Sequence, residues 1–403
     1  AALTKEDVPD SVLTAYGLES LKFGEDYIIP KPLDPRVLLW ESPAVAKAAM
    51  ETGVARRMID LDEYRQQLAF RQGMGEQVRY YFINKARQIP QKKRIVFAEG
   101  EETKIIRAAA QVFDEGIGLP ILVGRPQVIH DKVESLGLDF TPQVVCPPEF
   151  ERIEAYAQVL YEMRQRKGMT LQDARKRVLE PNLFGPLMVK MGDADAFVSG
   201  LTYDYPEVIR PALQIHHTAP GSRRAAGVYI MIANGKVYLF TDATVNIEPT
   251  AEDLAEIACL SASFARQVGL EPRVALLSFS NFGSTPHSLS VKVQRAVQII
   301  RERCVDFPVD GEMQADTAVT AEIIDERYPF SQVKDANVLV FPSLEAANIA
   351  YKLLARLGNA QAIGPILLGM GAPMHVLQTG AEVRDIVNIA AVAAIDAAKR
   401  EKV

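Results

Sequence analysis

The alternation of short apolar runs with helical stretches after Lys92 constrains the fold more than any other feature of the sequence. Buried strands are predicted at residues 94–98, 119–123 and 144–146, and a helical stretch follows each of the first two. Strands joined through helices usually lie parallel in one sheet, with the helices packed on its faces. The sequence therefore predicts an α/β fold here, and a further strand is expected at residues 196–199.

A hairpin signal interrupts this alternation. Residues 228–232 and 236–240 are apolar runs that flank Asn234-Gly235. Asn-Gly between two apolar runs is typical of a tight β-hairpin turn. A hairpin within an α/β alternation indicates the start of a second domain with a mixed sheet. Strands at residues 274–278 and 337–341 are expected to complete it.

The first 90 residues have a different texture. Residues 23–36 form an extended stretch with several prolines and no hydrophobic period, which is expected to need a partner surface. Ser42-Pro43 is predicted to start a helix over residues 44–57, with Ser at the N-cap and Pro at the first helical position. A second helix, rich in aromatic residues, is predicted at residues 62–86.

Composition excludes several classes of protein. A chain of 403 residues can form two or three domains, and its net charge of −6 argues against general nucleic-acid binding. No run of about 18 apolar residues is present, so no membrane span is expected. The first residues lack the pattern of a signal peptide. Cys146, Cys259 and Cys304 are scattered without metal-ligand spacing, which predicts buried thiols in a cytoplasmic protein.

The common cofactor motifs are missing from the sequence. It has no His-Glu-x-x-His, no cysteine pair, no Gly-x-Gly-x-x-Gly after a strand and no phosphate loop ending in Gly-Lys-Ser/Thr. His216 and His217 are adjacent on a predicted helix, so their side chains point to different faces. Neither a metal site nor the usual nicotinamide or ATP site is expected in this chain.

Two loops are candidates for chemistry. Residues 370–385 contain the turn formers Gly371, Pro373 and Gly380 before a predicted helix, and functional residues often lie on such loops. Residues 277–284 are a strand that runs into a polar glycine loop, where backbone N–H groups could hold an anion. An ordinary strand–helix turn with a serine cap is the favoured alternative for that second loop.

Three further features carry charge. Residues 310–314 (Asp-Gly-Glu-Met-Gln) are predicted to form a similar polar turn. Arg164 belongs to a basic cluster at the end of a helix, where an ordinary solvated, dipole-complementing role is the better explanation. Arg210 lies in an otherwise apolar helical stretch, so it is expected to face a cleft or an ion-pair partner.

Taken together, residues 78–403 resemble phosphotransacetylase, the family that moves an acetyl group between coenzyme A and phosphate. The resemblance implies two α/β domains facing a ligand cleft, with the three-layer architecture of isocitrate and isopropylmalate dehydrogenases. Residues 78–221 with 365–403 would form the first domain, and residues 222–364 the second, which would make a homodimer contact. The segments that carry the resemblance are residues 97–101, 121–125, 193–200, 209–214, 246–256, 271–278, 310–316, 348–352 and 364–367.

The N-terminal part resembles a different family. Residues 23–32 and 43–55 are similar to the tail of a bacterial malic enzyme, so residues 1–77 are interpreted as that tail and a helical linker. The combination resembles the hybrid NADP-dependent malic enzymes, which carry a phosphotransacetylase-like C-terminal region. This implies that the chain is a fragment. The residues for malate, NADP and a divalent metal would then lie upstream of residue 1.

The resemblance also assigns site residues. It places Arg164 and Arg210 toward coenzyme A and its anionic substrate, and Asp385 as the base on the thiol. The family's Ser-Arg pair is replaced by Gln378 and Thr379, and loss of such a charge donor typically costs about 100- to 1000-fold in rate. Two further departures remove groups that hold phosphate: Tyr205-Pro206, and Asn281-Phe282 in the glycine loop.

These departures predict a site that binds acetyl-CoA without transferring the acetyl group. The expected function is a regulatory acetyl-CoA-binding and oligomerisation region of a malic enzyme, with Asp385 as a remnant base. The sequence leaves the sign of that regulation open. A working phosphate acetyltransferase and a purely structural assembly module are the alternatives. The predicted ligand-binding residues are Arg164, Arg210, Ser280, Asn281, Gly283, Ser284, Gln378 and Asp385.

Overall fold

The computed structural model divides into two compact units, Ala1–Tyr81 and Phe82–Val403, which are considered separately. The structure describes residues 3–5, 8, 10–18, 21, 23–25, 27–32, 34, 36–303 and 305–400. Cys304 lies outside the described residues. Among the helices of this part of the chain, none combines the length and apolar character needed to span a bilayer.

The helices of the N-terminal unit differ from the sequence prediction in two places. Helix α2 begins at Arg36 and not after Ser42, and Pro43 lies inside it. The Asp34 carboxylate binds both the backbone N–H and the guanidinium of Arg36 at this start. The predicted helix over residues 62–86 is two helices, because Gly73 between them adopts a φ of 111°. The helices concerned are α1 (Asp10–Tyr16), α2 (Arg36–Glu51), α3 (Leu61–Gln72) and α4 (Met74–Arg87).

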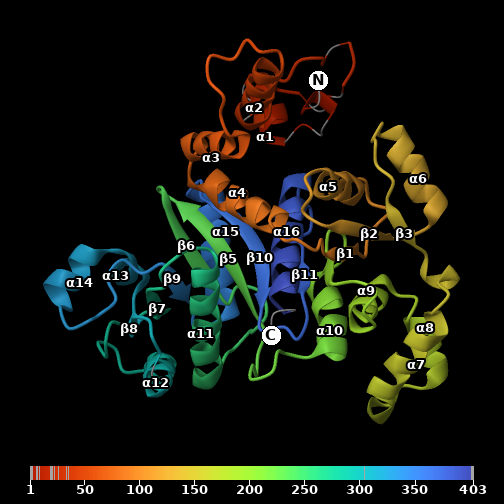
Figure 1. The fold of residues 1–403 in the computed structure, drawn as a ribbon. Helices are drawn as coiled ribbons and strands as arrows, with labels where there is room; N and C mark the ends of the chain where they lie inside the picture. Colours follow the sequence, from red (N-terminus) through yellow and green to blue (C-terminus); the bar gives the residue numbers. More distant parts are fainter. Residues whose placement is uncertain are drawn as a thin grey trace. The chain divides into compact units, whose positions relative to one another are not determined.

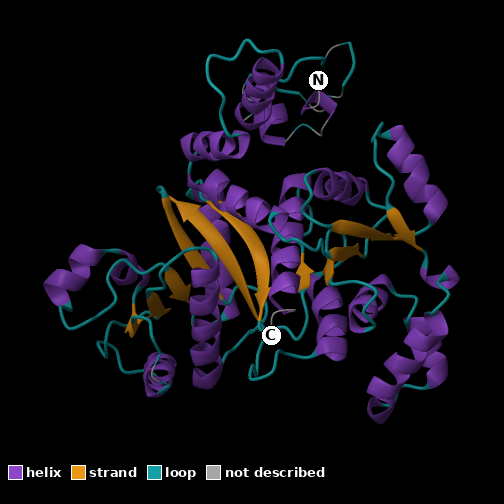
Figure 2. Cartoon of the chain, in the orientation of Figure 1, coloured by secondary structure: helices purple, strands orange, loops and turns teal. Residues whose placement is uncertain are grey.

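The first sheet of the larger unit is wholly parallel, as the alternation of strands and helices predicted. Its strand order is β11-β4-β1-β2-β3. Figure 2 shows that helices surround these short strands. The last strand in the sequence, β11, is an edge strand of this first sheet. The strands are β1 (Arg94–Phe97), β2 (Leu119–Val123), β3 (Gln143–Val145), β4 (Ala196–Ser199) and β11 (Met374–Val376).

The helices around the first sheet bury a continuous apolar core. Tyr156, Phe184 and Phe197 are fully buried in it. Helix α16 returns from the C-terminus to pack on α5, β1 and β4, and Figure 1 shows it in blue beside these earlier elements. The helices are α5 (Thr103–Asp114), α6 (Pro126–Ser135), α7 (Ile153–Arg164), α8 (Leu171–Arg177), α9 (Pro181–Lys190), α10 (Tyr205–His216) and α16 (Val383–Arg400).

The second sheet is mixed, with strand order β10-β5-β6-β9-β7-β8. The predicted hairpin is confirmed: β5 and β6 pair antiparallel, with Ala233 opposite Lys236. Asn234 and Gly235 both have positive φ, at 51° and 73°, as a type I′ turn requires. The strands are β5 (Ala226–Ala233), β6 (Lys236–Thr241), β7 (Val274–Leu277), β8 (Val309–Met313), β9 (Val338–Val340) and β10 (Gln361–Leu368).

Two features of this sheet differ from expectation. Residues 310–314 are mostly strand β8 and not a polar turn, and Val309 and Met313 are buried. The division predicted between residues 364 and 365 falls inside β10, which pairs with β5 from Gln361 to Leu368. The helices of this region are α11 (Ala251–Gln267), α12 (Ser288–Glu302), α13 (Ala315–Val319), α14 (Ala321–Arg327) and α15 (Leu344–Leu357).

Candidate functional site

A cleft of about 690 Å³ receives residues from both sheets. The N-terminal turn of α10 and the loop after β11 contribute from the first domain, and β5, the loop after β6, α15 and β10 contribute from the second. The residues that line the cleft are Asp204, Tyr205, Tyr229, Ala243, Thr244, Leu344, Asn348, Tyr351, Lys352, Ala355, Arg356, Ala362, Pro365, Leu377, Gln378 and Thr379.

Two stacked tyrosines and one amide form a wall of the cleft. The rings of Tyr229 and Tyr351 lie 4.2 Å apart with an interplanar angle of 18°. Gln378 Nε2 donates to the hydroxyl of Tyr229 at 2.5 Å and to that of Tyr351 at 3.2 Å. The Gln378 amide is therefore committed to these two hydroxyl groups, and residues 377–382 after β11 include no Lys or Arg.

Tyr205 is the third tyrosine among the residues that line the cleft. The Tyr205 hydroxyl shares a hydrogen bond of 2.9 Å with Thr244 Oγ1. Burial raises the pKa of both Tyr205 and Tyr229 well above the ordinary range. Neither ring can therefore carry a negative charge near neutral pH, and both remain hydrogen-bonding hydroxyl groups.

Helix α15 contributes two positively charged side chains to the lining of the cleft. Lys352 and Arg356 are four residues apart, so they lie on the same face of this helix. Lys352 Nζ lies 5.9 Å from the ring centroid of Tyr351, within reach of a cation–π contact. Within the described chain, no carboxylate forms an ion pair with Lys352 or Arg356. Both side chains are exposed at the rim, where an anionic ligand could reach them.

Most of the predicted ligand-binding residues lie outside this cleft. Of these eight residues, all of which are described, Gln378 lines the cleft and the other seven do not. Arg164 ends α7 and is half-buried, whereas Arg210 is exposed on α10. Sequence reasoning did not select Tyr229, although residues 348–352, which include Tyr351 and Lys352, were among the segments that carried the resemblance.

Asp385 lies in the first turn of α16. Its carboxylate accepts the backbone N–H of Glu382 at 3.2 Å, which is half of a capping box. Burial raises the pKa of Asp385. A base needs a pKa nearer to neutrality than that of an ordinary aspartate, so this direction is compatible with the remnant base inferred from the sequence.

The glycine loop after β7 is closed by a carboxylate of the same chain. Glu312 is fully buried, and its Oε1 accepts hydrogen bonds of 2.8 Å from Ser280 Oγ and from the Gly283 N–H. The N–H groups of Asn281 and Ser284 also have acceptors within the loop. The backbone donors that the sequence suggested for an external anion are thus used internally, as in an ordinary structural turn.

Two other strand ends are closed in the same way. Glu99 accepts the N–H groups of Gly200 and Leu201, at 2.8 and 3.0 Å. Asp242 accepts those of Gly227 and Thr244, at 2.9 and 3.0 Å. A carboxylate in a nest of backbone N–H groups occupies the position that a bound anion takes in other proteins.

In residues 3–400, apart from the gaps given above, no group of three or more His, Cys, Asp or Glu side chains is arranged to hold an ion. The cleft combines tyrosine and threonine hydroxyl groups, the amides of Asn348 and Gln378, the Asp204 carboxylate and two rim cations.

The fold is that of two-domain phosphotransacetylases. A phosphotransacetylase from Streptococcus pyogenes superposes with a TM-score of 0.75 at 36% identity, over 80% of this chain and 98% of that chain. The EutD phosphotransacetylase from Staphylococcus aureus superposes with a TM-score of 0.72 at 34% identity, with the same coverage. Residues 78–394 match the family described as phosphate acetyl/butaryl transferase, and the chain belongs to this family.

Two kinds of relative share this region. The phosphate acetyltransferase of Thermoanaerobacterium thermosaccharolyticum is 42% identical over 315 residues, which are 76% of this chain and 95% of that protein. The NADP-dependent malic enzyme of Rhizobium meliloti is 41% identical over 403 residues, which are 98% of this chain but 52% of that enzyme. The chain thus spans about half the length of the malic enzymes it matches, and the match includes its N-terminal unit.

Proposed function

We propose that this chain is the regulatory acetyl-CoA-binding and oligomerisation region of an NADP-dependent malic enzyme, with a degenerate acetyltransferase site. The parent reaction would be the oxidative decarboxylation of malate to pyruvate, in the cytoplasm. The proposal draws support from the match to a malic enzyme over 98% of the chain, including residues that phosphate acetyltransferases do not match. NADP and a divalent metal would be held by the upstream part of the parent protein.

The observation that carries the proposal is the position of Gln378. The resemblance to phosphotransacetylases implies a Ser-Arg pair where this chain has Gln378 and Thr379. The Gln378 amide donates to the hydroxyl groups of Tyr229 and Tyr351, and burial raises the pKa of Tyr229. An acetyl transfer would develop negative charge near this loop, and a neutral amide stabilises that charge much less than a guanidinium does.

Acetyl-CoA is the ligand that the cleft supports best. Its phosphates could approach Lys352 and Arg356, and its thioester could approach the hydroxyl groups farther in. The exposed Arg210 and the half-buried Arg164 remain the cations that the resemblance assigns to this ligand. The test is calorimetric titration of the 403-residue chain with acetyl-CoA, with acetyl phosphate formation assayed on the same sample.

A pair of matched variants separates the two sets of cations. If α15 holds the phosphates, Lys352→Met weakens acetyl-CoA binding by about tenfold, which is typical for one charge-assisted contact. Arg210→Ala then changes little. If the resemblance assigns the site correctly, the result is reversed. Absence of both binding and turnover in the unmodified chain contradicts the proposal and leaves the structural assembly module.

The alternative function is a working phosphate acetyltransferase. It is favoured by the coverage of a phosphate acetyltransferase over 95% of its length and by the raised pKa of Asp385. The paired substitution Gln378→Ser with Thr379→Arg restores the residues that the family resemblance implies. Under our proposal the unmodified chain forms no acetyl phosphate and the restored variant gains turnover. Turnover by the unmodified chain supports the alternative.

Oligomerisation is proposed to involve the second domain. On α15, Ile349, Leu353 and Leu357 recur every four residues, and their exposed fractions are 52, 52 and 79%. An apolar stripe exposed to this extent is typical of an association surface. Leu353→Lys should lower the mass of the particle measured by light scattering, whereas Lys352→Met should not. The upstream malic enzyme part would be the second partner of the chain.

A further inference from the structure

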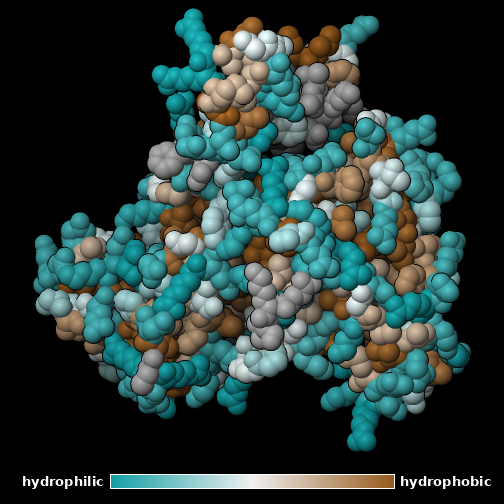
Figure 3. Space-filling view, in the orientation of Figure 1, coloured by the Kyte–Doolittle hydropathy of each residue, from teal (hydrophilic) through white to brown (hydrophobic). Residues whose placement is uncertain are grey.

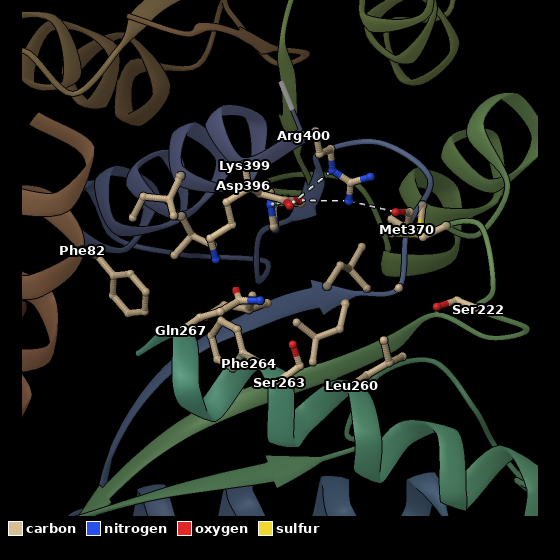
Figure 4. A pocket seen from close by; sticks show the side chains of 18 of the residues that line it. Phe82, Ser222, Leu260, Ser263, Phe264, Gln267, Met370, Asp396, Lys399 and Arg400 are labelled. Carbon is tan, nitrogen blue, oxygen red and sulfur yellow. Dashed lines mark hydrogen bonds and ion pairs between the residues drawn. The ribbon is translucent and has the colours of Figure 1, made fainter. Parts of the chain in front are cut away.

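A second cavity lies on the other side of β10 from α15, between α11 and α16. It has a volume of about 200 Å³. Figure 4 shows Asp396, Lys399 and Arg400 on one wall, facing α11 and its side chains Ser263 and Gln267 across the cavity. The residues that line it are Phe82, Lys85, Ala219, Ser222, Leu260, Ser263, Phe264, Gln267, Ile366, Leu367, Leu368, Gly369, Met370, His375, Val392, Ile395, Asp396, Lys399 and Arg400.

This cavity and the cleft are separate sites, because no residue lines both. The second one is called the α11–α16 cavity below. Residues 366–370, at the end of β10 and just after it, form part of its wall. Two of its lining residues, Phe82 and Lys85, come from α4, the helix that continues from the N-terminal unit.

Lys399 brings a positive charge to this cavity, and no described carboxylate forms an ion pair with it. In the described part of the chain, its ammonium has neither an ion-pair partner nor a hydrogen-bond acceptor. Burial, followed by the charge of Lys85, lowers its pKa to about 8. Burial and the charge of Lys85 both disfavour the charged form of Lys399. An anion between the two would relieve both effects.

His375 is a second polar group left without a partner. Its side chain is 1% exposed, and neither ring nitrogen has a hydrogen bond from any described group. Asp396 Oδ2 is 3.7 Å from its Nε2, beyond hydrogen-bond distance. Arg400 binds Asp396 and the Met370 carbonyl, so that carboxylate is already compensated. Burial lowers the pKa of His375 to about 4, and the neutral ring retains one N–H donor.

The other lining residues and the volume of the cavity restrict the size and charge of a ligand that could fit. Leu260, Phe264, Ile366, Val392 and Ile395 present only hydrocarbon. A volume of about 200 Å³ corresponds to roughly six or seven waters at ~30 Å³ each. The Asp396 carboxylate and the apolar walls disfavour a dianion such as phosphate, which would need many more donors.

We propose that the α11–α16 cavity binds a short-chain monocarboxylate, with its carboxylate held by the Lys399 ammonium and its hydrocarbon tail against Leu260, Phe264 and Ile395. The His375 N–H and the hydroxyl groups of Ser222 and Ser263 are the additional donors within the cavity. The charged groups that face this site from all sides are Lys85, His375, Asp396, Lys399 and Arg400. The site does not depend on acetyl-CoA binding in the cleft.

The test is calorimetric titration of the 403-residue chain with sodium butyrate, butyramide and inorganic phosphate. Butyrate is expected to bind, whereas its uncharged isostere butyramide and phosphate are not. Lys399→Met keeps the apolar stem and removes the charge, so it should weaken butyrate binding by about 10- to 100-fold. Lys399→Arg should retain most of it. The cleft variant Lys352→Met is the matched control and should bind butyrate normally.

Two further measurements keep the proposal falsifiable if Lys399→Met folds poorly. Leu260→Phe narrows the cavity, so it should reject pentanoate while still accepting acetate. In the unmodified chain, butyrate binding at pH 8.5 should take up protons, because the bound anion raises the pKa of Lys399. Proton uptake is measured by titration in buffers of different ionisation enthalpy.

Equal binding of butyrate and butyramide overturns the proposal, as does unchanged butyrate affinity in Lys399→Met. Tighter binding of phosphate than of butyrate would also overturn it.

Discussion

The loop after β7 and the α11–α16 cavity differ in the hydrogen-bond partners that they provide for buried polar groups. In the loop, Oε1 of the fully buried Glu312 carboxylate receives hydrogen bonds from Ser280 and Gly283, while its Oε2 has no partner among the described residues. In the cavity, the described chain offers Lys399 no acceptor, and it offers His375 neither a donor nor an acceptor. A buried polar group with partners stabilises the fold, whereas one without partners is costly unless a ligand supplies them.

The difference indicates which polar groups could still gain a hydrogen bond from a ligand. The three carboxylates Glu99, Asp242 and Glu312 close the loops that could have held an anion at strand ends. The Gln378 amide in the cleft is an intermediate case, because it has partners but remains partly exposed.

The largest loss of stability is expected for Glu312→Ala. The substitution leaves the buried Ser280 hydroxyl and the Gly283 N–H without their acceptor, which should lower the free energy of unfolding by about 3–5 kcal/mol. The measurement is urea unfolding followed by circular dichroism, because the single tryptophan, Trp40, lies in the N-terminal unit. Glu326→Ala, at an exposed glutamate of α14, is the control and should stay within about 0.5 kcal/mol.

The second effect is a loss of stability in acid caused by His375. Its folded pKa of about 4 lies below the unfolded value of 6.5, so between these pH values the unfolded chain binds the extra proton. Stability should therefore fall as pH falls from 6.5 to 4, by about 3 kcal/mol at most. His375→Leu should remove its share of this slope, whereas the share of His216, whose pKa burial also lowers to about 4, should remain. Replacement of the exposed His130 by leucine should leave the whole slope unchanged. An unchanged slope in His375→Leu would contradict the assignment.

A smaller loss is expected in the cleft. Gln378→Ala removes the amide that donates to Tyr229 and Tyr351, and its partial exposure lets water replace part of what is lost. The free energy of unfolding should fall by about 1 kcal/mol. The same urea unfolding measures it, with Thr379→Ala as the neighbouring control. A loss above about 3 kcal/mol would show that the cluster is a structural core and not a cleft wall.

The smallest change is expected to have the opposite sign. Lys399→Met removes the cost of burying half of an ammonium group. The free energy of unfolding should therefore rise by up to about 1 kcal/mol near pH 7, with allowance for solvent screening. The folded pKa of Lys399, about 8, lies below the unfolded value of 10.5. The stability of the unmodified chain should therefore rise between pH 8 and 10.5, and the advantage of the variant should disappear there. Destabilisation by Lys399→Met at pH 7 would contradict the contrast.

Local signals explain what the sequence predicted well. The hairpin needed only Asn234-Gly235 between two apolar runs. Predictions from local sequence were wrong where tertiary contacts determine the secondary structure. Pro43 suggested a helix start, but Asp34 fixes the start at Arg36. Residues 310–314 look polar in sequence, yet they pair with β7 as strand β8.

The candidate site was harder to predict than the fold. The glycine loop suggested an anion site, because the donors are local while the carboxylate that occupies them lies about 30 residues farther along the chain. The cleft joins Gln378 to Tyr229 across 149 residues, and the α11–α16 cavity joins segments from residue 82 to residue 400. The periodicity of a single sequence carries no information about contacts between residues so far apart in the chain.

The return of β11 and α16 to the first sheet has a consequence for synthesis on the ribosome. Strand β4 ends at Ser199, and its neighbour β11 begins at Met374, so residues 200–373 must be translated before that pairing can form. At ~5–20 residues per second this delay is about 10–35 s. During that time one edge of β4 is without its strand partner, in a nascent polypeptide whose second domain is still emerging. The first domain to be made is thus the last to be completed, because its sheet waits for a strand that is translated after the second domain.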